Sequence, residues 1–212
     1  MVDNNSGKYS IPEGESYQAG SNNTVLANKL RISSVGEMEK VEATLLQKAD
    51  EKMIDIYSVN HQFNTEDVCD LHRLWLSDVY TWAGKYRTVN MSKGGFQFAA
   101  AHLIPKLMQD FEKKILKKYT PTHVTNKKQL TEALAIVHVE YILIHPFREG
   151  NGRLGRMLAT LMTLQAGFPI LDFNDITTGS NRERYFSAVQ QGMDCNYEPM
   201  AKVFEQVIKD SY

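Results

Sequence analysis

The segment from Ile142 to Leu158, ILIHPFREGNGRLGRML, constrains the fold more than any other part of the chain. It lies between two segments with apolar residues at helical spacing, yet it holds a histidine, a proline, charged residues and glycines. Pro146 disfavours the helical conformation at His145, so the first helix should end there. A second helix should begin near Asn151 and run to about Gly167. The sequence therefore predicts two long buried helices joined by a polar loop.

The remainder of the chain has the pattern of a mostly helical protein. Apolar periodicity favours helices over 65–84, with Thr65 as the cap, and over 102–119, 125–144, 181–193 and 198–210. Another helix should start near Ser33 or Ser34 and carry Met38, Val41, Leu45 and Leu46 on one face. The segment YRTVNMSKGGFQFA departs from this periodicity, because its residues alternate around two glycines. That pattern predicts one hairpin, at about Thr88 to Ala99.

Length and composition limit the class of protein. A chain of 212 residues with 42% hydrophobic residues is large enough for one domain with a core. A formal net charge of -1 gives no general attraction to nucleic acid, so direct nucleic-acid binding is not expected. The polar N-terminus lacks the apolar region of a signal peptide, and no apolar run is long enough for a membrane span. Cys69 and Cys195 form no metal or redox motif, which favours a reducing, cytoplasmic setting.

The polar loop carries groups that suit a nucleotide polyphosphate. Gly150, Asn151 and Gly152 fall at a helix N-terminus, where unpaired N–H groups and the helix dipole favour an anion. Arg153 and Arg156 lie about one turn apart, so both can face the same ligand.

Two further residues of the loop add charge and acid–base chemistry. Glu149 would repel an anion at this position unless Mg²⁺ bound to a nucleotide bridges them. His145 can accept a proton near neutral pH. The loop therefore predicts a Mg-nucleotide phosphate site with a general base beside it.

The run from His145 to Arg156 resembles the signature of the Fic-domain family, H-x-F-x-D/E-G-N-G-R-x-x-R, at every defined position. LANKLRISSVGEMEKVEA and DVYTWAGKYRTVNMSKGGFQFA are also similar to segments of that family, so the resemblance covers roughly Leu26 to the C-terminus. It implies an all-α Fic fold, a helical bundle with one β-hairpin flap. Residues 1–24 would form a flexible N-terminal segment and residues 25–212 the Fic domain. The implied activity is transfer of AMP from ATP to a Tyr, Thr or Ser hydroxyl of a target protein, with Mg²⁺ present.

The resemblance also implies roles by position. His145 would be the general base and Phe147 would anchor the loop. Glu149 would hold Mg²⁺, Gly150, Asn151 and Gly152 would form the anion hole, and Arg153 and Arg156 would grip the β- and γ-phosphates. The hairpin would bind the target protein by strand addition. The residues of this flap would be Thr88, Val89, Asn90, Met91, Ser92, Lys93, Gly94, Gly95 and Phe96.

Regulation is where the chain departs from part of the family. Many members carry an inhibitory motif, S/T-x-x-x-E-G/N, and no segment here matches it fully. Glu13-Gly14 has Tyr9 where Ser or Thr is needed, and Glu37 is followed by Met38. The chain therefore resembles the toxins that a separate small antitoxin protein inhibits in trans. We expect no glutamate of this chain to lie against Arg153.

Several alternatives stay open. A Fic branch that transfers phosphate carries Lys where Gly152 stands, and a non-catalytic nucleotide-binding module would have lost the motif His or an Arg. A Fic-type transferase could use a nucleotide other than ATP, and a small-molecule nucleotidyltransferase would not need an exposed hairpin. The remaining histidines and both tryptophans, Trp75 and Trp82, are expected to serve packing or surface roles.

Overall fold

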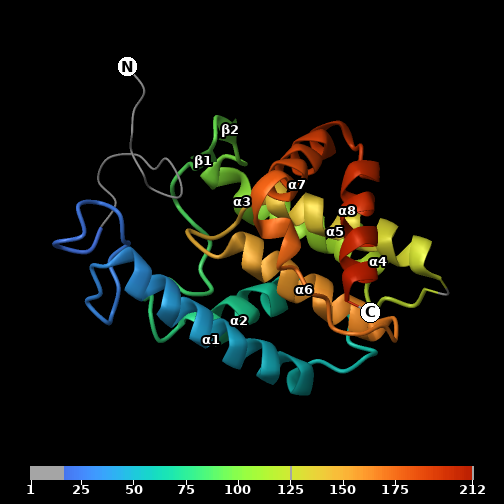
Figure 1. The fold of residues 1–212 in the computed structure, drawn as a ribbon, viewed down its shortest axis with the longest axis horizontal. Helices are drawn as coiled ribbons and strands as arrows, with labels where there is room; N and C mark the ends of the chain where they lie inside the picture. Colours follow the sequence, from blue (N-terminus) through green and yellow to red (C-terminus); the bar gives the residue numbers. More distant parts are fainter. Residues whose placement is uncertain (1–16, 125, 212) are drawn as a thin grey trace.

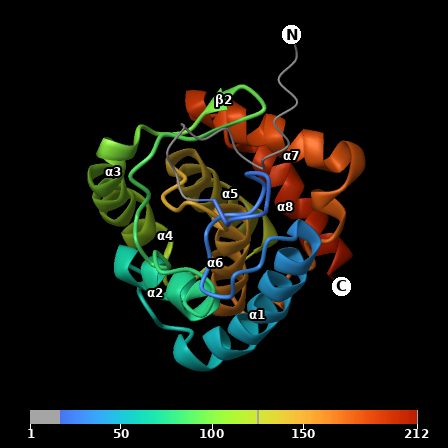
Figure 2. The same ribbon diagram turned by 90° about the vertical axis from the view of Figure 1, so that its left-hand side faces the viewer.

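The computed structural model describes residues 17–124 and 126–211, and its described part is a helical bundle built around two antiparallel helices. These are α5 (Lys127–Ile144) and α6 (Asn151–Gln165), which the polar loop joins and which pack against each other. Figure 2 shows them in the middle of the molecule, with the other helices around them. The surrounding helices are α1 (Val35–Ile56), α2 (Thr65–Leu76), α3 (Ile104–Phe111), α4 (Lys117–Tyr119), α7 (Gly179–Gln191) and α8 (Glu198–Asp210).

Helices α5 and α6 follow the sequence prediction because their signals are local. Helix α5 buries nearly every side chain of its central turns and ends at Ile144. His145 adopts the left-handed conformation, at φ 52° and ψ 60°, so the chain leaves the helix at the residue before Pro146. Gly150 caps α6 with φ 82°. The all-α class and the polar connection between two buried helices are confirmed.

The single hairpin is also confirmed in the described part of the chain. Strands β1 (Ser92–Lys93) and β2 (Phe96–Gln97) pair antiparallel. Gly94 and Gly95 form the two-residue turn with φ 55° and 80°. Such turns need positive φ at both central positions, which glycine adopts without steric cost. Figure 1 shows the hairpin projecting beside α3 and α7, at one end of the bundle.

Two sequence predictions about helix ends are wrong. The cap of α2 is Asn64, whose side chain accepts hydrogen bonds from the N–H groups of Glu66 and Asp67, so Thr65 is the first helical residue. Helix α2 ends at Leu76 and not at Gly84. The segment after Leu76 follows tertiary contacts and not its helical periodicity, because the N–H of Gly84 donates to a ring nitrogen of buried His72.

Helix α1 turns the predicted apolar face toward the core, and its most buried positions lie along one edge of that face. Ser34 caps it as expected, and Met38 is buried. The other buried positions are Glu42, Ala49 and Met53, whereas Val41, Leu45 and Leu46 are only partly covered. A glutamate therefore lies on the inner face of the first long helix.

The segment before α1 is bonded to itself and to the bundle. Tyr17 and Leu26 form an isolated bridge, and the backbone N–H of Lys29 donates to the carbonyl of Val79. The first sixteen residues of the expected N-terminal segment, with Glu13-Gly14, lie outside the described residues. No helix in the described part of the chain is long and apolar enough to cross a membrane.

Candidate active site

His145 lies at the C-terminal end of α5 with its ring held in one tautomer. Its Nδ1 is 3.2 Å from the carbonyl of Ile142, which can only accept, so Nδ1 carries the proton and Nε2 keeps its lone pair. Phe98, next to the hairpin, stacks on the ring with centroids 3.7 Å apart. Burial lowers the pKa of His145 to about 3. The ring is therefore neutral near pH 7 and presents a proton acceptor.

The loop that follows His145 is hydrogen-bonded to the first residue of α6. Phe147 is fully buried, as predicted. The side chain of Asn151 bonds to Phe147 twice: its Oδ1 accepts from the N–H at 2.9 Å, and its Nδ2 donates to the carbonyl at 2.7 Å. Asn151 can therefore offer a ligand only its backbone, because its amide holds the loop in shape.

His72 and Trp75 of α2 contact the loop on its buried side. The sequence had predicted only packing or surface roles for both residues. His72 stacks on Phe147 at 4.0 Å, accepts from the N–H of Gly84, and lies with Nε2 3.1 Å from the carbonyl of Glu149, to which it donates. Burial lowers the pKa of His72 to about 4, which keeps this bonding pattern at neutral pH. A Cβ on Gly150 would lie 2.5 Å from Trp75, so the close approach and the positive φ both require glycine.

Arg153 corrects the expectation that no glutamate of the chain lies against it. Its Nη2 donates to Glu42 Oε2 at 2.6 Å and to Glu149 Oε1 at 3.0 Å. Glu42 is buried and also accepts from the hydroxyl of Tyr80 at 2.8 Å. The guanidinium lies over the ring of Trp75, 4.4 Å from its centroid. The expectation was wrong because it rested on a six-residue motif, whereas Glu42 reaches Arg153 from the inner face of α1.

One cavity of about 780 Å³ collects most of the predicted site residues. Its walls include these predicted residues: His145, Glu149, Gly150, Gly152, Arg153, Arg156, Lys93, Gly94 and Phe96. Asn151 is fully buried behind the loop, and the flap residues Thr88, Val89, Asn90, Met91, Ser92 and Gly95 lie outside the cavity lining. The arginines, the loop glycines and the flap tip thus share one opening with His145.

Helix α7 supplies a wall that the sequence prediction missed. Ile176 precedes this helix, and Tyr185, Phe186 and Val189 on it line the same cavity. Lys93 of the flap lies 4.7 Å above the ring of Phe186, which joins the flap tip to α7. The sequence showed only an ordinary amphipathic helix here, and nothing local in it signals that one face borders the cavity of the motif.

The residues present fit a divalent ion only together with a phosphate. In residues 17–124 and 126–211, no three His, Cys, Asp or Glu side chains gather closely enough to hold a metal. Glu149 is the carboxylate that faces the cavity from the loop, and its Oε1 accepts from the N–H of Gly150 at 2.8 Å. Mg²⁺ commonly binds through one or two carboxylates plus nucleotide phosphates, so this donor set suits a nucleotide-bound ion.

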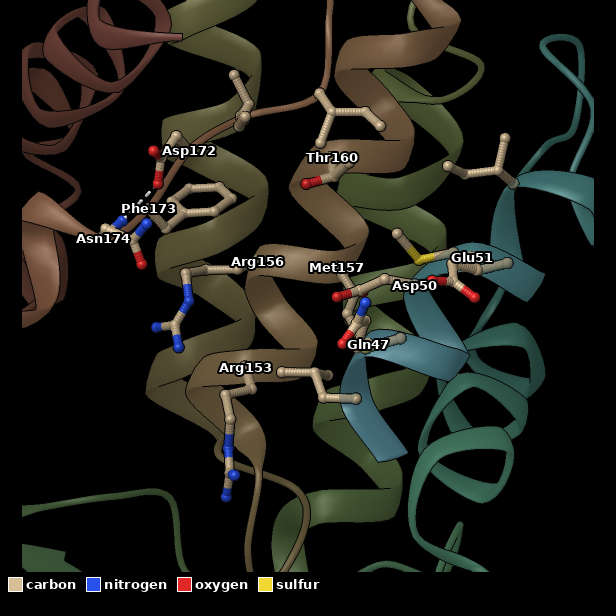
Figure 3. A pocket seen from close by; sticks show the side chains of 15 residues that line it. Gln47, Asp50, Glu51, Arg153, Arg156, Met157, Thr160, Asp172, Phe173 and Asn174 are labelled. Atoms are coloured by element: carbon tan, nitrogen blue, oxygen red, sulfur yellow. Dashed lines mark hydrogen bonds between the residues drawn. The ribbon is translucent and has the colours of Figure 1, made fainter. Parts of the chain in front are cut away.

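A second hollow lies behind the two motif arginines. It measures about 540 Å³ and lies between α1, α6 and residues 170–174. In Figure 3 Arg153 and Arg156 project from the same side of α6, with Asp50 of α1 across the hollow. Burial raises the pKa of Asp50 to about 6, and the charge of Arg156 opposes that shift. We call this space the α1–α6 groove.

A helical bundle with one hairpin is the architecture that the Fic resemblance implied, and comparison with known proteins agrees. Residues 62–163 match the Fic/DOC family model. The chain is 25% identical to a probable protein adenylyltransferase of Sinorhizobium fredii over 185 residues, which are 87% of this chain and 91% of that protein. The chain therefore carries a Fic/DOC segment at residues 62–163 and resembles adenylyltransferases of that family over most of its length.

A further relative and two solved structures cover different shares of the chain. A protein adenylyltransferase of Caenorhabditis briggsae is 30% identical over 52% of this chain, which spans only 21% of that protein. Among solved structures, the Fic domain of Bep8 from Bartonella sp. 1-1C superposes with a TM-score of 0.73 at 21% identity, covering 87% of this chain and 90% of that domain. BepC from Bartonella tribocorum, solved with bound AMPPNP, gives 0.71 at 22% identity, covering 93% and 94%. These structures share the fold with this chain.

Proposed function

We propose that the chain is a protein adenylyltransferase that moves AMP from ATP to a Tyr, Thr or Ser hydroxyl of a target protein. The observation that carries the proposal is the single cavity shared by a neutral His145, the N-terminus of α6 and two arginines. The names of the relatives from Sinorhizobium and Caenorhabditis, and the AMPPNP bound to BepC, support the same activity.

The groups in the cavity account for the proton, the new bond and the leaving group of the transfer step. His145 Nε2 takes the proton of the target hydroxyl, which is a poor nucleophile when protonated. The hydroxyl oxygen then forms a bond to the α-phosphorus of ATP. The bond from that phosphorus to the oxygen of the β-phosphate breaks, and pyrophosphate leaves. The low pKa of His145 keeps the ring in the acceptor form before the step.

The phosphate chain should lie along the start of α6. The backbone N–H groups of Asn151 and Gly152 would stabilise the charge that grows on the α-phosphate, as helix N-termini do for anions. The N–H of Gly150, which donates to Glu149 Oε1, would join them when Glu149 turns to Mg²⁺. Arg153 and Arg156 would bind the β- and γ-phosphates. Glu149 would hold Mg²⁺, which supplies neutralising charge on the phosphates when bound.

The apolar wall on α7 is suited to the base of the nucleotide. Ile176, Tyr185 and Val189 offer a largely apolar surface in the cavity that the arginines share. Aromatic and aliphatic walls with few polar groups are typical of sites that bind the flat part of a ligand. Nucleotide preference would be set here, while the phosphates bind at the loop.

The hairpin is suited to hold a target segment. Its strands, Ser92–Lys93 and Phe96–Gln97, pair only with each other in the described part of the chain. An edge strand presents backbone groups to which an extended peptide can add. We propose that residues 88–96 bind the target in this way and place its hydroxyl near His145.

The restraint on this activity would come from a small antitoxin protein, and the chain would act as a toxin in a bacterial cytoplasm. The α1–α6 groove offers a place for a partner helix, because Leu46, Met53 and Met157 give it apolar walls and Arg156 borders it (Figure 3). A glutamate on such a helix could pair with Arg156 and exclude the γ-phosphate.

The origin of the restraint can be tested by truncation. Removing residues 1–16 should leave self-labelling with ATP unchanged if the inhibitor is a separate protein. Strongly increased self-labelling would mean that the chain inhibits itself and would contradict the antitoxin proposal. Overexpression of the full chain alone should slow growth of a bacterial host, and His145→Ala should remove the effect.

The position of the radiolabel tests the proposed reaction. Purified chain, Mg²⁺ and a lysate are incubated in parallel with ATP labelled at the α- or the γ-phosphate. AMP transfer predicts labelled protein with the α-label only. A γ-label on protein would mean phosphate transfer, and no label with either would leave only nucleotide binding. His123→Ala is a matched control, since His123 is exposed and lines neither cavity.

A further inference from the structure

Arg87 is a buried cation that lies directly behind the candidate active site. It follows the segment after α2 and is 3% exposed. Its Nε donates to the carbonyl of His145 at 2.7 Å, and its Nη2 donates to the carbonyls of Ala99 at 2.6 Å and Ile144 at 3.3 Å. Its Nη1 donates to the carbonyl of Val89. The guanidinium thus touches four backbone carbonyls, two on each of two structural elements.

The first pair of carbonyls closes the end of α5. The last carbonyls of a helix have no partner within it and carry the negative end of the helix dipole. Arg87 donates to those of Ile144 and His145, and its own backbone N–H donates to Pro146 at 2.8 Å. The left-handed conformation of His145 is therefore fixed from outside the helix by one side chain.

The second pair of carbonyls belongs to the two legs of the flap. Val89 precedes β1 and Ala99 follows β2, so the guanidinium binds the hairpin on both sides of its base. Ala99 in turn donates its N–H to the carbonyl of Leu143 in α5. Between these anchors Phe98 stacks on the ring of His145. The guanidinium of Arg87 therefore holds both the base of the flap and the backbone of His145.

We propose that Arg87 is a positioning residue for the transfer reaction, because it fixes the flap that receives the target relative to His145. The proposal rests on the function proposed above. Arginine suits the task, since its planar fork of donors reaches several carbonyls at fixed angles, whereas lysine concentrates its donors on one nitrogen.

The charge of Arg87 gives this role a distinct signature. His145 faces three charged groups from three elements: Arg87 behind it, Lys93 in the flap and Glu149 in the loop. Burial is the largest cause of the low pKa of His145. The charges of Arg87 and Lys93 lower this pKa further, and the charge of Glu149 raises it. Removing the Arg87 charge should therefore raise the pKa of His145, whereas a lysine at this position should change it little.

The test compares Arg87→Gln and Arg87→Lys with the parent and with Arg184→Gln, an exposed arginine on α7. Three quantities are measured for each purified chain. They are the Kd for Mg-ATP by calorimetry, the rate of α-label transfer to lysate proteins at saturating ATP, and the His145 pKa by NMR titration of its ring.

The proposal predicts a separation of these quantities. Both Arg87 variants should bind Mg-ATP within about threefold of the parent, because the phosphate contacts remain, and should transfer label at least about tenfold more slowly. Only Arg87→Gln should raise the His145 pKa. If that variant does not fold, Arg87→Lys still carries the test through its rate and its Kd.

Other outcomes overturn the proposal. Parent rates in both variants would show that the carbonyl contacts do not position the reaction. Parallel losses of ATP binding and of rate, with an unchanged His145 pKa, would show that Arg87 only supports folding. If the parent chain itself transfers no label, the proposed adenylyltransferase function is wrong. This failure is distinguished from failure of the Arg87 proposal because it is seen without any variant.

Discussion

The contact between Glu42 and Arg153 leads to a quantitative prediction about nucleotide affinity. Glu42→Gln removes one negative charge with almost no change in shape. A glutamine can still accept from Arg153 with its oxygen and donate to the hydroxyl of Tyr80 with its nitrogen. Arg153 also keeps its contacts with Glu149 and Trp75, so its position should be retained.

The size of the effect follows from the distances. Glu42 Oε2 lies 2.6 Å from Arg153 Nη2. A phosphate oxygen bound to the same guanidinium would lie about 5 Å from that carboxylate, where two unit charges repel by roughly 3 kcal/mol at an effective dielectric constant near 20. Mg²⁺ and solvent reduce the repulsion, so about 1.4 kcal/mol is expected to remain, which corresponds to about tenfold tighter binding of ATP.

The assay is calorimetric titration of Mg-ATP into the parent, Glu42→Gln and Glu39→Gln. Glu39 lies one turn earlier on α1 and borders the cavity that Arg153 lines, but it is exposed. Solvent screens its charge, so its removal should change the Kd by less than about twofold. Unchanged or weaker ATP binding by a folded Glu42→Gln chain would refute the reasoning, because Glu42 would then act by holding Arg153 in place.

Two further predictions concern the flap and the buried histidines. Replacing Gly94–Gly95 with two valines should lower label transfer to lysate proteins at least about tenfold while the Kd for ATP stays within about twofold, and equal losses of both would mean that the hairpin is only structural. Burial lowers the pKa of His72 and His138 to about 4 and that of His145 to about 3. The folded chain therefore resists protonation that the unfolded chain accepts below about pH 6.5, and each ring should remove about 2 kcal/mol of unfolding free energy between about pH 7 and pH 5. The raised pKa of Asp50 acts in the opposite direction and offsets part of the stability lost through one of these rings. Urea melts that show no loss of stability over this pH range would contradict the low pKa values of the three histidines.

The sequence predicts the central helices and the loop chemistry well because those signals are local. Pro146 ends one helix, Gly150 begins the next, and the charged residues between them are neighbours in the chain. The turn at Gly94–Gly95 is equally local. These features require no knowledge of what packs against them.

The supporting contacts could not be predicted in the same way. Glu42 meets Arg153 across 111 positions, His72 meets Glu149 across 77, and Arg87 meets His145 across 58. In the sequence these three residues look like ordinary helical or loop positions. Their roles follow only when the fold places α1, α2 and the flap around the loop, because burial and partner geometry decide what a charged group does.

The measurement that tests the central claim most directly compares binding and transfer in His145→Ala. The Kd for Mg-ATP is measured by calorimetry, and α-label transfer to lysate proteins is measured with the parent and His123→Ala as references. Because His145 is proposed only to remove a proton, ATP binding should stay within about twofold, while transfer should fall by about 10²- to 10⁴-fold. A variant that transfers label at the parent rate, or one that loses ATP binding and transfer together, would contradict the assignment of His145 as the general base.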